Sequence, residues 1–365
     1  MIGKIICDLA SNNLNNRNSE GAFIKLKNGD LMFAYTHYRG EGDEDHSTAD
    51  LYAMLSKDEG ENFATPFLLL SCEDVIADNI MSVSLMRMKN GDLGIFYLQK
   101  HNEMQSCIPY LAISSDEGKT WYAHIRCINE DGYYVLNNDR VIRLRSGRLL
   151  MPVAKHEYKD DTFLPGIVLM YASDDDGRTW NKISNEIKLD LFHVKRKEVY
   201  YMIDSMEEPG VVELENGTVW CFVRTRLGTQ YETFSKDSGA SWSPLQPSPF
   251  TSPNSPMSVK KLKSGNLFTV WNPIPLYNGR CQNDEVALTG ARTPLVFAVL
   301  NKEGEFGPEY TKIETEEKAG FCYCAIYETE TGDILLGYCA GSISDGGCLN
   351  RIRIRKIYKS DFNEI

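Results

Sequence analysis

Short apolar runs of strand length recur along the chain, and each run follows a turn that ends in glycine. The first is Asn28-Gly29 before Asp30-Leu31-Met32-Phe33-Ala34-Tyr35. Equivalent turns end at Gly91, Gly147, Gly217, Gly265 and Gly332. Glycine adopts positive φ without steric cost, which suits the tight turn of a β-hairpin, and Leu, Phe, Val, Trp and Tyr dominate the runs. Six copies predict six antiparallel hairpins, each belonging to a small sheet.

A second pattern, the octet Ser-x-Asp-x-Gly-x-x-aromatic, occurs four times in step with the first. The octets are Ser56 to Phe63, Ser114 to Trp121, Ser173 to Trp180 and Ser235 to Trp242. Their aspartates lie 58, 59 and 62 residues apart, a period that accommodates one small sheet. In such a turn the Ser or Asp side chain can bond backbone amides, glycine takes the reversal and the aromatic ring packs back. We interpret the octets as structural turns.

Sheets that repeat in this way cover both faces by packing around an axis, as in a β-propeller. We predict an all-β fold, a six-bladed β-propeller of four-stranded antiparallel sheets. Residues 1–365 are expected to form this single domain, because the repeat runs nearly end to end. Residues 351–358 alternate apolar and basic side chains as a half-buried strand does, and Gly3 to Leu9 is the other terminal strand. Pairing these two strands in one blade would close the ring.

Composition narrows the class of protein. The chain is 42% hydrophobic and 25% charged, as is usual for a globular protein, and a net charge of −12 argues against a nucleic-acid partner. No apolar run could span a membrane or serve as a signal peptide, so we expect a cytoplasmic protein without a membrane partner. The ten cysteines lie mostly in strand-like runs, which predicts buried thiols. No motif indicates a cofactor, and no zinc or EF-hand spacing indicates a metal.

Functional side chains are expected where the repeat brings equivalent positions to one face. Nine residues before the turn glycines stand Glu20, Ser82, Asn138, Glu208, Pro256 and Tyr323. A purely structural position would tend toward one residue type, so this variety of polar groups indicates a ligand at the mouth of the axis. Alternation along a strand predicts that Cys322 and Cys324 point away from Tyr323.

At these residues the chain resembles the sialidases, or neuraminidases, six-bladed propellers marked by the same octets, usually called Asp-boxes. The segment 208–217 resembles the family's Glu-x-x-Val-Val-Glu-Leu-x-x-Gly segment, so Glu208 would assist the nucleophile. Arg224 matches the second substrate arginine of the family, and Arg292 lies in a segment like the one that carries the third. Tyr323 stands where the family places its tyrosine nucleophile.

The resemblance also implies an acid/base aspartate. Asp45, eleven residues before Ser56 of the first octet, falls where that aspartate lies in the family. The surrounding loop is rich in acidic residues, and Asp43, Glu44 and Asp50 are alternatives.

This set of groups suits a retaining glycosidase. A phenol is neutral, so it can approach an anomeric carbon that bears a carboxylate without repulsion. Glu208 would take the proton of Tyr323, and Asp45 would protonate the leaving oxygen and then activate water. Arg224 and Arg292 would hold an anionic group through bidentate bonds.

The chain departs from the family at one ion pair. The first substrate arginine of the family lies in a Tyr-Arg-Ile-Pro segment, and the matching stretch here is residues 17–22, in which Ser19 or Glu20 takes its place. The glutamate that supports this arginine is replaced by Cys339. A Glu20 that faces the ligand would repel a carboxylate and suit sugar hydroxyls, which indicates a remodelled pocket.

Four further polar residues are candidate substrate-binding groups. Asn138, Asp139 and Arg140 follow one another at the start of the third repeat. Arg140 either replaces some of the missing positive charge or forms a surface ion pair with Asp139. Gln230 follows Arg224 closely.

Three functions fit these residues, and each has a carbohydrate partner. The first is a sialidase-like retaining glycoside hydrolase that cleaves a terminal, acidic sugar with a tyrosine nucleophile. The second is a glycosidase of the same scaffold that acts on a non-sialic sugar. The third is a non-catalytic carbohydrate-binding propeller. The sequence leaves the sugar, the linkage and the oligomeric state open.

Overall fold

The structure is a computed structural model that describes residues 2–40, 42–101, 105–159, 162–189, 205–275, 288–305, 307 and 309–362. The prediction of an all-β fold is confirmed, because strands make up nearly all of its regular structure. The 3-10 helices η1 (Ile343–Asp345) and η2 (Lys359–Asp361) are a single turn each. Among the described residues, no helix is long and apolar enough to cross a membrane.

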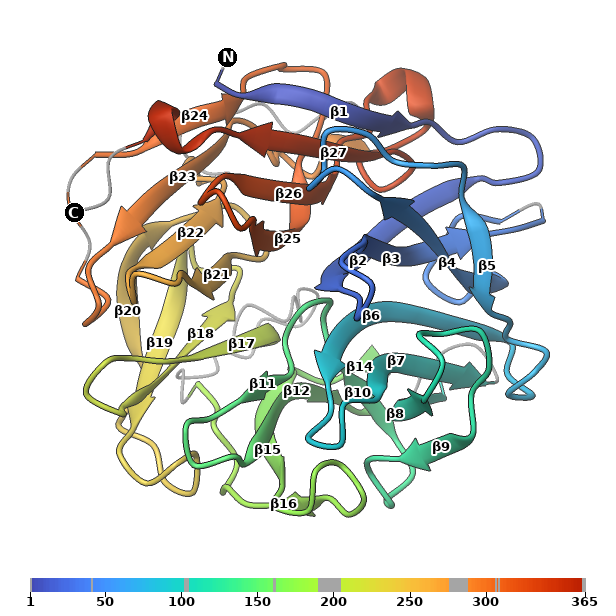
Figure 1. The fold of residues 1–365 in the computed structure, drawn as a ribbon. Helices are drawn as coiled ribbons and strands as arrows, with labels where there is room; N and C mark the ends of the chain where they lie inside the picture. The colour runs from blue at the N-terminus through green and yellow to red at the C-terminus, as the bar shows by residue number, and fades with distance from the viewer. Residues whose placement is uncertain are drawn as a thin grey trace.

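Four of the sheets consist of four antiparallel strands each. In pairing order they are β2 (Arg17–Lys25), β3 (Leu31–Tyr38), β4 (Ala49–Ser56) and β5 (Phe67–Leu70); β17 (Glu207–Glu213), β18 (Val219–Arg224), β19 (Thr229–Ser235) and β20 (Gln246–Thr251); β21 (Ser258–Lys261), β22 (Leu267–Trp271), β23 (Leu295–Leu300) and β24 (Thr311–Glu314); and β25 (Cys322–Glu328), β26 (Ile334–Cys339), β27 (Ile352–Ile357) and β1 (Lys4–Leu9). The turn glycine that joins the first two strands of each has φ between 84° and 93°. In Figure 1 the sheets surround a common central region, and β1 lies beside β27.

The second and third repeats differ from the expected separate sheets, because they form one sheet of nine strands. Its strands are β6 (Asn79–Arg87), β7 (Leu93–His101), β8 (Ser106–Ser114), β9 (Ala123–Arg126), β10 (Tyr133–Val135), β11 (Ile142–Arg143), β12 (Leu149–His156), β15 (Ile167–Ser173) and β16 (Asn181–Lys182). The short strand β10 joins the two repeats, since it pairs in parallel with β8 and antiparallel with β12. The strands β13 (Tyr158–Lys159) and β14 (Thr162–Phe163) form a separate hairpin.

The octets form closed turns, as the sequence predicts. In the first, Ser56 Oγ donates to Asp58 Oδ1 at 2.8 Å and accepts the backbone N–H of Gly60 at 2.8 Å. The same bonds recur in the other three octets. The octet glycine also abuts a leucine of the preceding repeat, for example Gly118 beside Leu69, where a Cβ would lie 2.9 Å from Leu69 Cδ1. The octets therefore also join neighbouring repeats.

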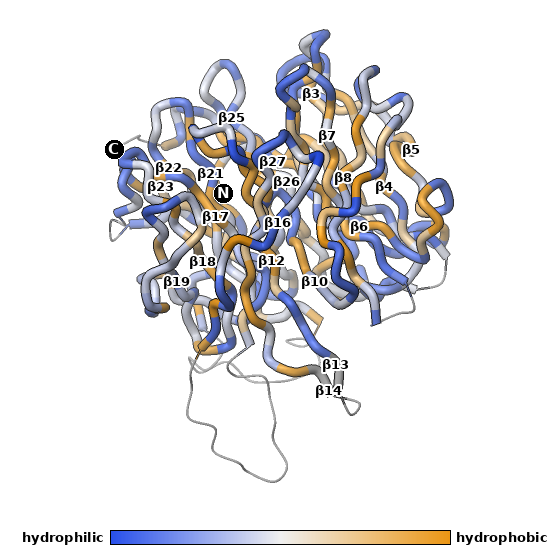
Figure 2. The backbone as a smooth tube through the Cα atoms, turned by 90° about the horizontal axis from the view of Figure 1, so that it is seen from below, coloured by the Kyte–Doolittle hydropathy of each residue, from blue (hydrophilic) through white to orange (hydrophobic). Residues whose placement is uncertain are grey.

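The hydrophobic cores lie between neighbouring repeats. One cluster joins Phe268 and Phe297 of the β21–β24 sheet to Ile326 and Leu336 of the last sheet, and the rings of Phe268 and Phe297 stack 4.8 Å apart. Figure 2 shows hydrophobic segments along the strands and hydrophilic residues at many turns. Packing of this kind fixes the direction in which each innermost strand points.

Candidate active site

The position nine residues before a hairpin glycine is a β-bulge in four of the repeats. In β2, β6, β17 and β25 the pairing with the next strand shifts register there. The residue in the bulge has a left-handed backbone, with φ of 55° at Glu20, 61° at Ser82, 48° at Glu208 and 57° at Tyr323. This conformation costs a non-glycine residue about 1–3 kcal/mol and is retained mainly at functional sites. These four residues are the starting point for a candidate site.

Tyr323 and Glu208 meet across two sheets. The Tyr323 hydroxyl donates to Glu208 Oε1 at 2.7 Å, and Arg224 Nη1 donates to Glu208 Oε2 at 2.7 Å. Arg224 also pairs with Glu207 at 3.2 Å and donates from Nε to Asn254 Oδ1 at 2.7 Å. The phenol, the carboxylate and the guanidinium therefore form one network of nearly buried groups.

Burial dominates the protonation of this network. It raises the pKa of Tyr323 well above the ordinary value, and the negative charge of Glu208 raises it further, while Arg224 and Arg292 oppose both effects. The carboxylates of Glu208 and Glu207 raise the pKa of Arg224 despite its burial. Tyr323 is therefore a neutral phenol at rest, with a proton acceptor in hydrogen-bond contact.

Arg292 lies against the same tyrosine. Its guanidinium carbon is 5.4 Å from the centre of the Tyr323 ring, and Nη1 donates to Cys322 Sγ at 3.0 Å and weakly to Cys348 Sγ at 3.8 Å. The Nε atom is buried without a hydrogen-bond partner, and within the described residues Arg292 has no carboxylate partner. Its Nη2 makes only a long contact, 3.5 Å, with the backbone oxygen of Asn254.

The thiols beside Arg292 correct one expectation. Cys322, Cys339, Cys348 and Tyr323 form one buried cluster, so Cys322 does not point away from the site, because the bulge at Tyr323 interrupts the strand alternation. Cys324 does lie in the core between sheets. The nine cysteines in the described part of the chain are free thiols.

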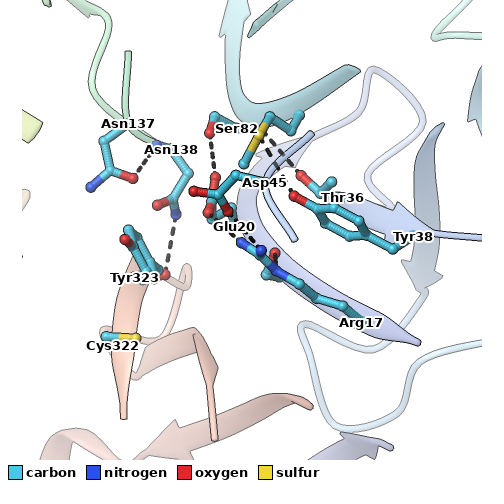
Figure 3. Close-up of polar contacts among 12 residues, drawn as sticks. Arg17, Glu20, Thr36, Tyr38, Asp45, Ser82, Asn137, Asn138, Cys322 and Tyr323 are labelled. Atoms are coloured by element: carbon cyan, nitrogen blue, oxygen red, sulfur yellow. Dashed lines mark hydrogen bonds and ion pairs between the residues drawn. The ribbon is translucent and has the colours of Figure 1, made fainter. Parts of the chain in front are cut away.

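A second charged network forms around Arg17. Arg17 Nη1 donates to Asp45 Oδ1 at 2.7 Å and Nη2 to Glu20 Oε1 at 3.1 Å. Ser82 Oγ donates to the other oxygen of Glu20, and the Arg17 guanidinium stacks 4.5 Å from the Tyr38 ring. Figure 3 shows Glu20, Asp45 and Ser82 grouped between Arg17 and Asn138, with Tyr323 nearby. Residues 17–22, where the sequence analysis found Ser19 or Glu20 in place of an arginine, thus contain a buried guanidinium, which is already paired with two carboxylates.

The two carboxylates around Arg17 differ in environment. Burial raises the pKa of Glu20, which the charge of Arg17 only partly offsets. Crowding by protein also acts to raise the pKa of Asp45, but the charges of Arg17, Lys100 and Arg224 outweigh it and hold this pKa well below its usual range. Asp45 is 62% exposed at its side chain, so it lies at the open side of the network and is ionised.

The structure distinguishes Asp45 from its alternatives. Asp50 is buried and accepts the backbone N–H of Cys72 at 2.8 Å. The Asp43 carboxylate accepts from Asn350 Nδ2 at 2.8 Å, and Glu44 lies 3.4 Å from His46. Of the four acidic groups, Asp45 is the one whose carboxylate faces Arg17.

The remaining candidates have protein partners. Asn138 Nδ2 donates to the backbone oxygens of Gly21 and Tyr323, at 2.8 and 3.2 Å, so it links three repeats. Gln230 is buried and donates to Ser252 Oγ and to the backbone oxygen of Ser255. These contacts hold the inner strands and loops in position around the site.

Asp139 and Arg140 do not form the surface pair that was one alternative. Asp139 pairs with Lys260 at 2.8 Å, and Arg140 is buried and donates to the backbone oxygen of Met257 at 2.5 Å. Asp139 has a φ of 54°, so in the third repeat the strained position lies one residue later than the fixed spacing predicts.

Sequence reasoning did not assign a role to Arg17 or Lys100. Lys100 is 3% exposed and donates from Nζ to the backbone oxygen of Asp45 at 2.7 Å. Its signal in the sequence is a basic residue two positions after the apolar run 95–98, near a strand end. No group of three His, Cys, Asp or Glu side chains in the described ranges is placed to hold a metal ion.

Comparisons with known proteins agree with this architecture. In structure, the chain resembles a protein of unknown function from Dyadobacter fermentans DSM 18053, with a TM-score of 0.72 and 17% identity over 98% of this chain and 99% of that one. It also resembles the NanB sialidase of Streptococcus pneumoniae, with a TM-score of 0.70 and 14% identity over 100% of this chain and 71% of that one. The intramolecular trans-sialidase of Ruminococcus gnavus gives a TM-score of 0.66 and 13% identity over 96% of both chains. At such identities the likeness establishes a shared fold.

A search of curated proteins gave no match. The family model of the BNR repeat-like domain, in contrast, matches residues 73–336, which is well over half of the chain. The chain therefore belongs to the BNR repeat-like family and shares its fold with the sialidases.

Proposed function

We propose that the protein is a sialidase-like retaining glycoside hydrolase whose nucleophile is Tyr323. The observation that carries this proposal is the 2.7 Å hydrogen bond from the Tyr323 hydroxyl to Glu208. A buried phenol that donates a hydrogen bond to a buried carboxylate is prepared to act as a nucleophile, because the carboxylate can accept its proton during the attack. The strained backbone of both residues supports a functional rather than a structural role.

The scaffold in this proposal is a six-bladed propeller formed by one domain. The nine-stranded sheet divides at β10 into two groups of four strands, which together with the four separate sheets make six. The contact of each octet glycine with the preceding repeat supports a radial order. The pairing of β1 with β27 supports closure of the ring through the two terminal strands.

The chemistry would proceed in two displacements. Tyr323 Oη attacks the anomeric carbon and passes its proton to Glu208, while the bond to the leaving oxygen breaks and Asp45 protonates that oxygen. Water, deprotonated by Asp45, then attacks the same carbon, the bond to Tyr323 breaks, and Glu208 returns the proton to the phenolate. Two inversions give a product with retained configuration.

Asp45 must first take up a proton, and Arg17 controls this step. In the free protein Arg17 holds Asp45 ionised. A substrate anion that pairs with Arg17 would withdraw its charge from Asp45, so the pKa of Asp45 would rise when substrate binds. Arg292 would hold the same anion, because it has no carboxylate partner among the described residues.

A glycosidase that acts on a non-sialic sugar is the second candidate. It is favoured by Glu20, whose carboxylate lies in the site and pairs with Arg17 and Ser82. With Arg224 paired to Glu207 and Glu208, the site holds less free positive charge than a clamp of three unpaired arginines would.

The test is a panel of chromogenic glycosides that includes sialosides and neutral sugars, assayed with the wild type and with Tyr323→Phe. Loss of cleavage in Tyr323→Phe and product of retained configuration by NMR would support the proposal. Tyr327→Phe, on the same strand but outside the site, is the matched control. Tight inhibition by a dehydrated sialic-acid analogue would favour the sialoside over the neutral sugar. Cleavage of no glycoside, or full activity of Tyr323→Phe, would contradict tyrosine catalysis.

A further inference from the structure

A second pocket, of about 400 Å³, lies away from the Tyr323 site. Its walls come from the third, fourth and fifth repeats, mainly from β11, β17 and β21. The lining includes the apolar side chains Ile142, Val211, Val212, Phe222 and Val259. The cavity is therefore amphiphilic, with an apolar wall and charged groups around it.

The pocket and the Tyr323 site lie toward opposite ends of the inner strands. On β17, Glu208 stands near the start of the strand and Glu213, which lines the pocket, stands at its end. Five residues of strand span roughly 17 Å. The lining residue of β17 nearest to Glu208 is Val211, about 10 Å along the strand, so a ligand in this pocket would lie beside the Tyr323 site without occupying it.

Positive charge predominates in the lining. Five of the lining residues are basic and two are acidic, in a chain of net charge −12. They are Arg140, Arg143, Arg145, Lys260 and Lys261 against Asp139 and Glu213. Carboxylates in and around the lining neutralise four of these five basic groups.

Among the basic residues of the lining, Arg140 is the one without an ion pair to any carboxylate in the described part of the chain. The others are paired: Arg143 with Asp176, Arg145 and Lys261 with Glu215, and Lys260 with Asp139. Arg140 is 3% exposed and stacks 5.3 Å from the Phe222 ring. Its Nη2 donates to the backbone oxygen of Met257, and its Nε is buried without a partner. Burial lowers the pKa of Arg140, and the charges of Asp139 and Glu208 only partly offset this effect.

We propose that this pocket binds a small organic anion, with its charged group at Arg140 and its apolar part against Val211, Val259 and Phe222. A buried guanidinium without a carboxylate is stabilised when an anion completes its hydrogen bonds. The apolar wall selects anions that carry a hydrophobic body over inorganic ions. The cavity volume is at the lower end of the range of small-molecule sites.

The test uses three probes on the full chain: benzoate, inorganic phosphate and benzyl alcohol. Calorimetry gives affinity, and NMR of valine methyl groups gives the location. We expect benzoate to bind saturably and to shift the methyl signals of Val211 and Val259. Benzyl alcohol, which lacks the charge, and phosphate, which lacks the ring, should each bind about tenfold more weakly or not at all.

Variants separate this pocket from the Tyr323 site. Arg140→Gln should weaken benzoate about tenfold or more, and Val259→Phe, which fills the pocket, should abolish its binding. Arg140→Gln alters a buried position and is expected to reduce the folding yield, so Val259→Phe keeps the proposal testable. Arg292→Met removes the guanidinium of the other site that has no carboxylate partner among the described residues, and it should leave benzoate affinity unchanged. No saturable benzoate binding, or binding lost in Arg292→Met and kept in Val259→Phe, would overturn the proposal.

Discussion

The Tyr323 hydroxyl donates a 2.7 Å hydrogen bond to Glu208 Oε1, although 115 positions separate the two residues in the chain. The other oxygen of the same carboxylate accepts from Arg224 at 2.7 Å. Glu208 is thus held between the guanidinium of Arg224 and the phenol of Tyr323. The two hydrogen bonds fix the orientation of its carboxylate, which its own strand would leave free. Such a pair acts as a unit, because each group sets the protonation of the other.

The first prediction concerns that unit. Tyr323→Phe and Glu208→Gln should each lower kcat/KM for a cleaved glycoside by about 10²–10⁴-fold. The double variant should lose little more than either single one, because removing one partner already disables the other. Steady-state kinetics of the three variants measure this, and Tyr327→Phe should keep wild-type activity. Losses that multiply in the double variant would mean that the two residues act independently.

The second prediction concerns the protonation of Asp45. Its carboxyl carbon should titrate by NMR below the ordinary Asp range near 3.9, because Arg17 and Lys100 stabilise the charged form. Arg17→Met should raise the pKa of Asp45, whereas Arg148→Met, which removes an ion pair with Asp174 in the third repeat, should leave it unchanged. An ordinary pKa in the wild type would contradict the ion pair, even if Arg17→Met proved too unstable to measure.

The same shift predicts a dependence of stability on pH. A folded-state pKa below the unfolded value means that the ion pair contributes its full stability above about pH 4. That contribution is lost as the pH falls toward the lowered folded-state pKa. In urea unfolding, the stability difference between the wild type and Asp45→Asn should be constant at neutral pH and shrink in acid. A stability difference that increased in acid would have the opposite pH dependence and would contradict this explanation.

The fold could be predicted from the sequence because its repeats carry local signals. Turn glycines and octets mark the turns between strands, and the structure has strands before and after these turns. The joined sheet was not predictable, because it depends on β10, a strand of three residues without a turn signal. Pairing of so short a segment is decided by the neighbouring strands and not by its own sequence.

The site was less accessible to such reasoning. The fixed spacing brought Glu20, Glu208 and Tyr323 to attention, and all three lie in bulges with positive φ. Nothing in their residue types predicts that backbone, because glycine is the usual signal for it. Arg17 was missed because its side chain contacts Glu20, three residues later, and Asp45 in a separate loop. These contacts depend on the tertiary structure.

The third prediction tests the octet as a joint between repeats. Gly60 has φ of 83° and a Cβ there would collide with Leu335, whereas Gly29 has φ of 93° and would meet nothing within 4 Å. Gly29→Ala should therefore cost only backbone strain, about 1 kcal/mol, and Gly60→Ala about 1–3 kcal/mol more. Chemical denaturation of the two variants measures the difference. Equal losses would show that the leucine contact does not limit the size of this residue.

The last prediction concerns Arg292, which would bind the anionic group of a substrate. Arg292→Lys keeps the charge but loses the planar pair of donors, so KM for an anionic glycoside should rise about tenfold or more, with a smaller effect on any neutral glycoside that is cleaved. Arg148→Lys, which alters a surface pair with Asp174, is the matched control. Cys322, whose Sγ accepts from Arg292 at 3.0 Å, is a weak acceptor and leaves the guanidinium free to turn toward an anion. An equal increase in KM for anionic and neutral glycosides would show that Arg292 positions Tyr323 and does not bind the anionic group of the substrate.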